Sequence, residues 1–214
     1  MIPQFPVYLF DIDGTLLDSA PDICAAVQQV LHDNHGGAKE FEYLRSFVGL
    51  HLIDLFQDVF PTFDAEQIDQ LIKQYRTIYL GRCHQQTKLF PGAKEALAAL
   101  GGRKSTATTK GTPTTRAILE QFGLLQYFEQ VQGTDGFPCK PAPDVILTAL
   151  AALGAKPGDC LMVGDSVADI TAARAAGVKI CVTTYGYGQP SELAQANPDY
   201  WVSDLRELSR TSVG

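Results

Sequence analysis

The sequence lacks the cysteine pattern of a disulfide framework or a zinc site. Its five cysteines are odd in number, widely scattered and never spaced as Cys-x-x-Cys, whereas disulfide-rich domains and zinc sites use paired, closely spaced cysteines. This pattern predicts reduced thiols in an intracellular protein, and we expect a cytoplasmic location.

Long hydrophobic runs are also missing. The longest nearly apolar stretch, VILTALAALGA from Val145, is too short to span a bilayer. The N-terminus has no basic segment followed by a long apolar one, which is the pattern of a secretion signal. We therefore expect a soluble protein that has no membrane partner.

The chain has no excess of positive charge. Lysine and arginine number 17 against 24 aspartates and glutamates, which gives a net charge of −7. This balance argues against a general nucleic-acid surface and against a binder of anionic membranes. An anionic small-molecule substrate would then require local cations or a metal ion.

Two sequence patterns divide the 214 residues. From Ser19 to about Gln85 apolar residues recur at helical spacing, and no strand-like run interrupts them. After Pro91 and Gly92, short strand-like runs alternate with helical ones, which is typical of a doubly wound parallel sheet. Strands are predicted over residues 7–10, 104–108, 129–132, 160–163 and 179–183, and helices over residues 93–100, 113–122, 143–153 and 167–176. The predicted fold class is α/β, with a Rossmann-type core of residues 1–17 and 86–214 and a small α-helical domain inserted at residues 18–85.

Helix starts are marked by short polar residues. Ser19 stands in the S-x-x-D spacing with Asp22, and Pro21 lies in the first turn, so a helix is predicted to begin near Ser19. Thr112 before a proline is predicted to cap the next such helix, and Ser166 is a further candidate for a cap.

Polar side chains follow four of the predicted strands. They are Asp11, Asp13, Thr108, Thr109, Lys110, Lys140, Asp165 and Asp169. Open parallel sheets bind ligands beyond the carboxyl ends of their strands, so we expect these side chains to converge there. Taken singly, a loop lysine is more often a solvated surface residue and an aspartate a helix cap; it is their joint occurrence at strand ends that favours a functional site.

Carboxylates that meet at one sheet edge repel one another unless a cation lies among them. A donor set made of oxygen alone suits Mg²⁺, and Asp11 and Asp165 are the predicted ligands. A carboxylate beside a phosphate can attack phosphorus, which makes Asp11 the predicted nucleophile of an aspartyl-phosphate reaction. Asp13, two residues along on the same side of the strand, is predicted to move the proton. Thr108 and Lys140 are predicted to hold the phosphoryl group.

The motifs DIDGT, strand-ending Thr108, Lys140 in KPAPD, and GDSVAD, in this order, resemble those of the haloacid dehalogenase superfamily of phosphatases. The resemblance covers the whole chain and implies that residues 18–85 form the helical cap of that superfamily. It also implies that Asp11 is the nucleophile and Asp13 the general acid and base. The metal would be bound by Asp11, the backbone carbonyl of Asp13, and Asp165, with Asp169 supporting the metal site from behind.

Within that superfamily the chain looks most like the phosphoglycolate phosphatases. The stretches that carry this resemblance are DGTLLDSAPDI, RSFVG, LFPGAKEALAAL, LMVGDSVADITAARAAGVK and TYGYG. They imply Mg²⁺-dependent hydrolysis of a small phosphorylated metabolite, with 2-phosphoglycolate as the first choice, by a monomer or homodimer. The alternatives are an inorganic pyrophosphatase, a sugar-phosphate phosphatase or phosphomutase, and, more remotely, a regulatory binding protein without catalysis.

Some positions depart from the pattern or extend it. The second predicted strand, RKSTATT, is unusually polar, and Thr109 stands where an asparagine is common in this subfamily. Gly14 is expected to let the backbone turn tightly beside the phosphate. We expect Thr109 and Lys110 to contact the substrate, and Arg45 or His51 to recognise its non-phosphate end.

Overall fold

Five parallel strands form one sheet in the order β4-β1-β5-β6-β7 in the computed structural model, which describes residues 2–209. The strands are β1 Val7–Phe10, β4 Arg103–Thr106, β5 Cys160–Gly164, β6 Lys179–Thr183 and β7 Tyr200–Val202. Phe10 pairs with Thr106 on one side and Val163 on the other. This register aligns the carboxyl ends of β4, β1 and β5, so the residues that follow these strands come together.

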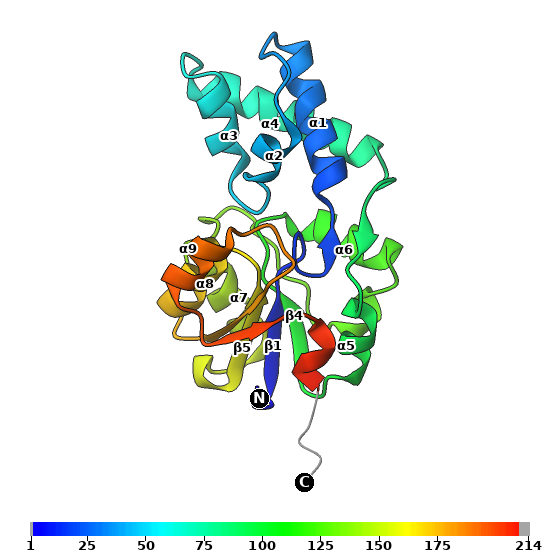
Figure 1. Cartoon of the computed structure of the whole chain (residues 1–214), viewed down its shortest axis with the longest axis vertical. Helices are drawn as coiled ribbons and strands as arrows, with labels where there is room; N and C mark the ends of the chain where they lie inside the picture. Colours follow the sequence, from blue (N-terminus) through cyan, green and yellow to red (C-terminus); the bar gives the residue numbers. More distant parts are fainter. Residues whose placement is uncertain (1, 210–214) are drawn as a thin grey trace.

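The central strand β1 is buried on both faces because helices cover both sides of the sheet (Figure 1). Tyr8 and Phe10 face a cluster that includes residues of α5 Ala93–Ala99 and α6 Thr112–Gln121. Val7 and Leu9 point the other way, toward α7 Asp144–Leu153, α8 Val167–Ala175 and α9 Pro190–Ala196. Successive strand residues alternate between faces, so a short unbroken apolar run serves two cores. The predicted α/β doubly wound fold is confirmed.

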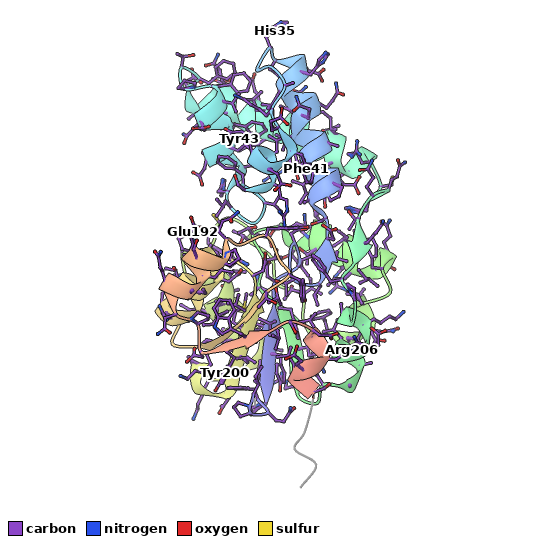
Figure 2. The ribbon with its side chains drawn as sticks, in the orientation of Figure 1. His35, Phe41, Tyr43, Glu192, Tyr200 and Arg206 are labelled. Atoms are coloured by element: carbon purple, nitrogen blue, oxygen red, sulfur yellow. The ribbon has the colours of Figure 1, made fainter. Side chains whose placement is uncertain are left out.

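A second group of helices stands beyond the carboxyl ends of the strands (Figure 1). It consists of α1 Ala20–Asp33, α2 Phe41–Arg45, α3 Leu52–Val59 and α4 Ala65–Gly81, which share a hydrophobic cluster of their own. His35, just after α1, lies at the end of this helical unit farthest from the sheet (Figure 2). The chain leaves through β2 Leu17–Asp18 and returns through β3 Lys88–Leu89, and these two short strands pair antiparallel. Outgoing and returning segments are therefore tied together at the base of the unit.

The predicted strand over residues 129–132 is wrong. Within the described residues this segment has one isolated bridge, between Ser105 and Gln130. The hydroxyl of Thr106 donates to the carbonyl of Gln132 at 2.8 Å and accepts from its N–H at 2.8 Å. Beside a backbone bond from the Glu129 N–H to the Lys104 carbonyl at 2.9 Å, side chains of β4 make this contact, which explains why the β4 sequence is so polar. The strand β4 itself ends at Thr106, two residues before its predicted end.

The helices begin at or near the predicted residues, but the hydrogen bonds that cap them differ from the prediction. Helix α1 begins after Ser19, but the Ser19 hydroxyl donates to Asp13 Oδ1 at 2.5 Å and caps no helix N–H. Helix α6 begins at Thr112 with Gly111 as its cap residue, so the predicted Thr112 cap is wrong by one position. Ser166 caps α8 in a reciprocal pair with Asp169, as predicted. The strand β7 and helix α9 had no counterpart in the prediction.

Neither disulfides nor membrane-spanning helices occur within the described residues. All five cysteines lie within residues 2–209 and are free thiols. In the same part of the chain, every helix is too short or too polar to cross a lipid bilayer.

Candidate active site

The residues predicted to act together meet where β1, β4 and β5 end. Asp11 follows β1 directly, and its N–H donates to the Val163 carbonyl at 2.9 Å. Asp165 follows β5, and Thr108 lies two residues beyond β4. Lys140 arrives from the loop before α7 and is buried. The parallel register is what brings these four residues, which are far apart in the sequence, to one edge.

A buried carboxylate cluster lies at this edge. Asp11, Asp165 and Asp169 each offer an oxygen within 4.8 Å of the others. Lys140 Nζ lies 3.0 Å from Asp11 Oδ1 and 2.6 Å from Asp169 Oδ1, with only 1% of its side chain exposed. Asp11 Oδ1 makes no well-directed hydrogen bond with any described residue, so its contact with Lys140 is an ion pair only. One lysine cannot neutralise three carboxylates, so the cluster keeps excess negative charge. A donor set made only of oxygens, one of them buried without a hydrogen bond, fits Mg²⁺.

Burial shapes the proton affinities of this cluster. Burial raises the pKa of Asp11 to about 6 against the opposing effect of Lys140, and the neighbouring Asp169 and Asp13 raise it further. Burial, Asp169 and Asp11 likewise hold the pKa of Asp165 well above its usual value. Burial alone would lower the pKa of Lys140, but Asp11 and Asp169 raise it above the ordinary lysine value. The lysine is therefore charged, and the carboxylates favour a proton or a cation.

Hydrogen bonds fix the orientation of Asp165 and Asp169. Asp165 Oδ1 accepts from the Thr15 hydroxyl at 3.0 Å, and its Oδ2 accepts from the Tyr187 N–H at 2.8 Å. Asp169 Oδ2 accepts from the N–H groups of Asp165 and Ser166 at 3.1 and 3.0 Å, while its Oδ1 meets Lys140. Asp169 therefore joins the start of α8 to the lysine, and both its oxygens are engaged by the protein.

Two glycines let the backbone approach Asp165 closely. Gly14 has a φ of +88°, and a Cβ there would lie 2.2 Å from Asp165 Oδ2. Gly186 would place a Cβ 2.2 Å from the Asp165 Cβ. The GYG pattern around Gly186 was the only sequence signal of this contact, and the sequence prediction missed the part played by Tyr187.

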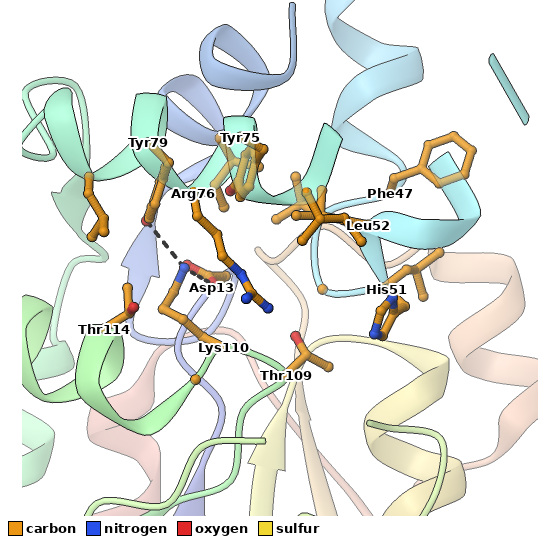
Figure 3. Close-up of a pocket in the computed structure, with 17 residues that line it drawn as sticks. Asp13, Phe47, His51, Leu52, Tyr75, Arg76, Tyr79, Thr109, Lys110 and Thr114 are labelled. Carbon is orange, nitrogen blue, oxygen red and sulfur yellow. Dashed lines mark hydrogen bonds and ion pairs between the residues drawn. The ribbon is translucent and has the colours of Figure 1, made fainter. Parts of the chain in front are cut away.

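Asp13 lies between the carboxylate cluster and the helical unit. Its Oδ1 accepts from Ser19, and its Oδ2 lies 3.2 Å from Lys110 Nζ. Lys110 Nζ also donates to the Tyr79 hydroxyl of α4 at 3.2 Å (Figure 3). Burial would lower the pKa of Lys110, but Asp13 and the tyrosines raise it. Thr108 is fully buried, and its hydroxyl accepts from the Lys110 N–H at 3.3 Å.

A cavity of about 180 Å³ opens between Asp13 and the helical unit (Figure 3). Thr109 and Lys110 line it from the sheet side, while His51, just before α3, and Arg76 of α4 line it from the helical unit. Arg45 does not belong to the described lining: its Nη2 donates to the Gly186 carbonyl at 3.4 Å, and its guanidinium lies 5.2 Å from the centre of the Tyr187 ring. The structure thus separates the two predicted recognition residues.

The sequence prediction missed Tyr75, Arg76 and Tyr79 as lining residues of this cavity. Their spacing on α4 is that of any amphipathic helix, and the prediction assigned the tyrosines to helix packing. Only the position of α4 over the sheet edge distinguishes a packing face from a cavity wall.

The fold and the site define an α/β protein whose buried carboxylate and lysine centre suits a divalent cation. A family model described as haloacid dehalogenase-like hydrolase matches residues 8–183. The chain belongs to this family, so the predicted resemblance is confirmed.

Individual relatives cover nearly the whole chain. It is 31% identical to a phosphoglycolate phosphatase of Nitrosococcus oceani over 97% of this chain and 96% of the relative. It is 35% identical to a phosphoglycolate phosphatase of Vibrio parahaemolyticus over 93% and 92% of the two chains. A crystal structure described as a predicted phosphatase from Clostridium acetobutylicum matches with a TM-score of 0.89 and 32% identity over 97% of both chains.

Proposed function

We propose that this chain is a Mg²⁺-dependent phosphatase that converts 2-phosphoglycolate to glycolate and phosphate. The observation that carries the proposal is the buried arrangement of Asp11 and Asp165 around a charged Lys140, with Asp13 two residues beyond Asp11. The names of the relatives from Nitrosococcus oceani and Vibrio parahaemolyticus support the choice of substrate. A small phosphorylated metabolite is the proposed partner, while the cytoplasmic location and the monomeric or homodimeric state stay predictions from the sequence.

Asp11 is the proposed nucleophile. A carboxylate oxygen of Asp11 forms a bond to phosphorus, and the bond from phosphorus to the glycolate oxygen breaks. Lys140, held by Asp169, neutralises charge on the transferring phosphoryl group. Mg²⁺ bound by Asp11, Asp165 and the backbone carbonyl of Asp13 would supply further positive charge to the phosphoryl oxygens.

Asp13 is the proposed carrier of the proton. It gives a proton to the departing glycolate oxygen, and it later takes one from the water that attacks the aspartyl-phosphate. That second attack releases phosphate and restores the Asp11 carboxylate. Ser19 and Lys110 each contact one oxygen of the Asp13 carboxylate. These contacts fix the orientation of the side chain while it gives and takes the proton.

The remaining predicted residues have positioning roles in this proposal. Gly14 brings the backbone close to Asp165, and the Thr108 hydroxyl lies beside the phosphoryl position. Thr109 and Lys110 form the sheet side of the substrate cavity, and His51 lies opposite them. Residues 18–85 act as a cap that excludes water from the site.

A phosphate-release screen tests the proposal. We expect Mg²⁺-dependent release from 2-phosphoglycolate at a rate well above those from pyrophosphate, sugar phosphates and nucleotides. The Asp11→Asn variant should be inactive, whereas Asp69→Asn on the exposed surface of α4 should match the wild type. Comparable rates on all substrates would remove the phosphoglycolate assignment. Substantial Mg²⁺-dependent turnover by Asp11→Asn would contradict the role of Asp11.

A further inference from the structure

We propose that Arg76 binds a carboxylate of the substrate and thereby selects phosphomonoesters that carry a second anionic group close to the phosphate. This inference rests on the proposed phosphatase function and names the residue that sets its specificity. Arg76 lines the cavity from α4, and its side chain extends toward Lys110 and Thr109 (Figure 3). It is exposed, so a ligand in the cavity can reach the guanidinium.

The other cations around the site already have anionic or polar partners. Lys140 pairs with Asp11 and Asp169, and Lys110 pairs with Asp13 and the hydroxyl of a tyrosine. Among residues 2–209, Arg76 makes no hydrogen bond or ion pair with another side chain. A guanidinium is charged at every working pH and offers a planar fork of donors, so Arg76 is free to hold an external carboxylate.

The cavity lining is more positively charged than the protein as a whole. The chain carries a net charge of −7, yet Asp13 is the one acidic side chain in the described cavity lining, and Lys110 neutralises it. Arg76 therefore leaves the cavity with uncompensated positive charge. Such a local cation attracts an anion that the rest of the surface repels.

His51 adds a second donor to the cavity lining. Its Nδ1 accepts from the Ile53 N–H at 3.2 Å at the start of α3. A ring nitrogen that accepts a hydrogen bond carries no proton, so the proton of the neutral ring is on Nε2. His51 can then donate to a carboxylate that Arg76 holds.

Much of the remaining described lining is apolar, and the cavity is small. Ile23, Phe47 and Ile72 line the cavity, and its volume of about 180 Å³ suits a small molecule. A hydroxyl group in the same place can accept a hydrogen bond from the guanidinium but brings no negative charge to pair with it.

The test compares two substrates that differ only at this end. They are 2-phosphoglycolate and 2-hydroxyethyl phosphate, in which an alcohol replaces the carboxylate. We expect Arg76→Gln to lower kcat/KM for 2-phosphoglycolate by about 10- to 100-fold, mainly through a higher KM, because a charge-assisted pair is lost. The same variant should change kcat/KM for 2-hydroxyethyl phosphate by less than about twofold. Arg76→Lys should restore part of the loss.

Lys73→Gln is the matched control. Lys73 is exposed on the same helix, three residues before Arg76, and lies outside the described lining. This variant removes the same charge and should leave both substrates unaffected. In an inactive Asp11→Asn background, calorimetry should show weaker binding of 2-phosphoglycolate when Arg76→Gln is added.

Two results would overturn the inference while the phosphatase function stands. One is an equal loss on both substrates, which would indicate a general effect on structure. The other is an unchanged preference for 2-phosphoglycolate in Arg76→Gln. Failure of the wild type to release phosphate from any ester would instead overturn the proposed function itself, and the inference with it.

Discussion

Lys140 Nζ lies 2.6 Å from Oδ1 of Asp169, and both side chains are buried. The same ammonium group reaches Asp11 at 3.0 Å. Asp169 in turn accepts hydrogen bonds from the backbone at the start of α8, next to Asp165. One lysine therefore connects the ends of β1 and β5 with a helix that packs on the sheet, and the charge balance of the centre depends on it.

Replacing Lys140 should disable and destabilise the protein at neutral pH. Lys140→Met leaves Asp11 and Asp169 as buried carboxylates without their cation, which costs about 3–5 kcal/mol. Loss of the positive charge at the phosphoryl position should lower kcat by about 10³-fold. Urea unfolding and phosphate release measure the two effects. Lys156→Met, at an exposed position, is the control, and near-normal turnover by Lys140→Met would rule out the proposed role.

The raised pKa of Asp11, about 6, predicts a pH dependence of metal binding. An aspartate of an unfolded chain has a pKa of about 3.9. The folded value is higher, so the contribution of Asp11 to stability is fully present below about pH 4 and is lost as the pH rises through about 6. Mg²⁺ replaces the proton, so its affinity should rise with pH through about 6, and the raised pKa of Asp165 extends this rise to higher pH.

Calorimetric titrations with Mg²⁺ at several pH values measure this dependence, and thermal unfolding with a chelator measures the stability. The Asp11→Asn variant should show neither the loss of stability around pH 6 nor the same proton release. An Mg²⁺ affinity that is equally tight at about pH 5 and about pH 7 would contradict the prediction.

Tyr187 ties the base of the helical unit to Asp165. Its hydroxyl accepts from the N–H groups of Ser19 and Ala20 at 2.8 and 2.9 Å and donates to Asp18 at 2.9 Å. Tyr187→Phe leaves these groups unbonded, and we expect a loss of about 1–3 kcal/mol in the free energy of unfolding. Turnover should fall because Ser19 also holds Asp13, whereas Mg²⁺ affinity should stay because the Tyr187 N–H is unchanged.

The control for this variant is Tyr200→Phe. The Tyr200 hydroxyl has no hydrogen bond to another described residue, so its removal should alter neither stability nor turnover. A Tyr187→Phe protein as stable and active as Tyr200→Phe would show that the hydroxyl contacts do not matter.

Asp22 holds the returning segment against α1. Its Oδ2 accepts from the Gln86 N–H and from the N–H and hydroxyl of Thr87 at 2.8 to 2.9 Å, and its Oδ1 meets Arg82 at 3.0 Å. Burial would raise the pKa of Asp22, but these hydrogen bonds lower it overall. A depressed pKa adds stability above about pH 4 that is lost as the pH falls through the folded value.

Asp22→Asn should therefore lower the free energy of unfolding by about 2–3 kcal/mol at neutral pH. Both oxygens of the Asp22 carboxylate accept hydrogen bonds, whereas an amide accepts only through its single oxygen. The difference from the wild type should shrink in acid, where the wild-type carboxylate becomes protonated. Urea unfolding at neutral and acidic pH measures it, with Asp69→Asn as the exposed control. A difference that does not depend on pH would contradict the assigned charge state.

From the sequence, four of the five strands of the sheet could be predicted, whereas β7 was missed and a strand at residues 129–132 was expected wrongly. Apolar runs such as residues 7–10 can only be buried strands in an alternating chain, and parallel strands necessarily bring their carboxyl ends to one edge. Asp11 and Asp165 are therefore expected together from the sequence alone, whereas Lys140 was assigned to this edge through a strand at residues 129–132 that does not form. The apolar run is visible in a few consecutive residues, and the convergence of the strand ends follows from the geometry of a parallel sheet.

The partner of each polar group could not be predicted from the sequence, because it depends on segments that meet only in the folded chain. The Thr106 hydroxyl bonds the Gln132 carbonyl where a strand ladder was expected, and the Ser19 hydroxyl donates to Asp13 and caps no helix N–H. Helical periodicity on α4 is the same whether a side chain packs or faces a cavity. Arg76 is a candidate for substrate recognition because α4 lies over the sheet edge and the side chain lines the cavity there. Whether a charged side chain has an ion-pair partner depends on which residues lie near it in the folded chain.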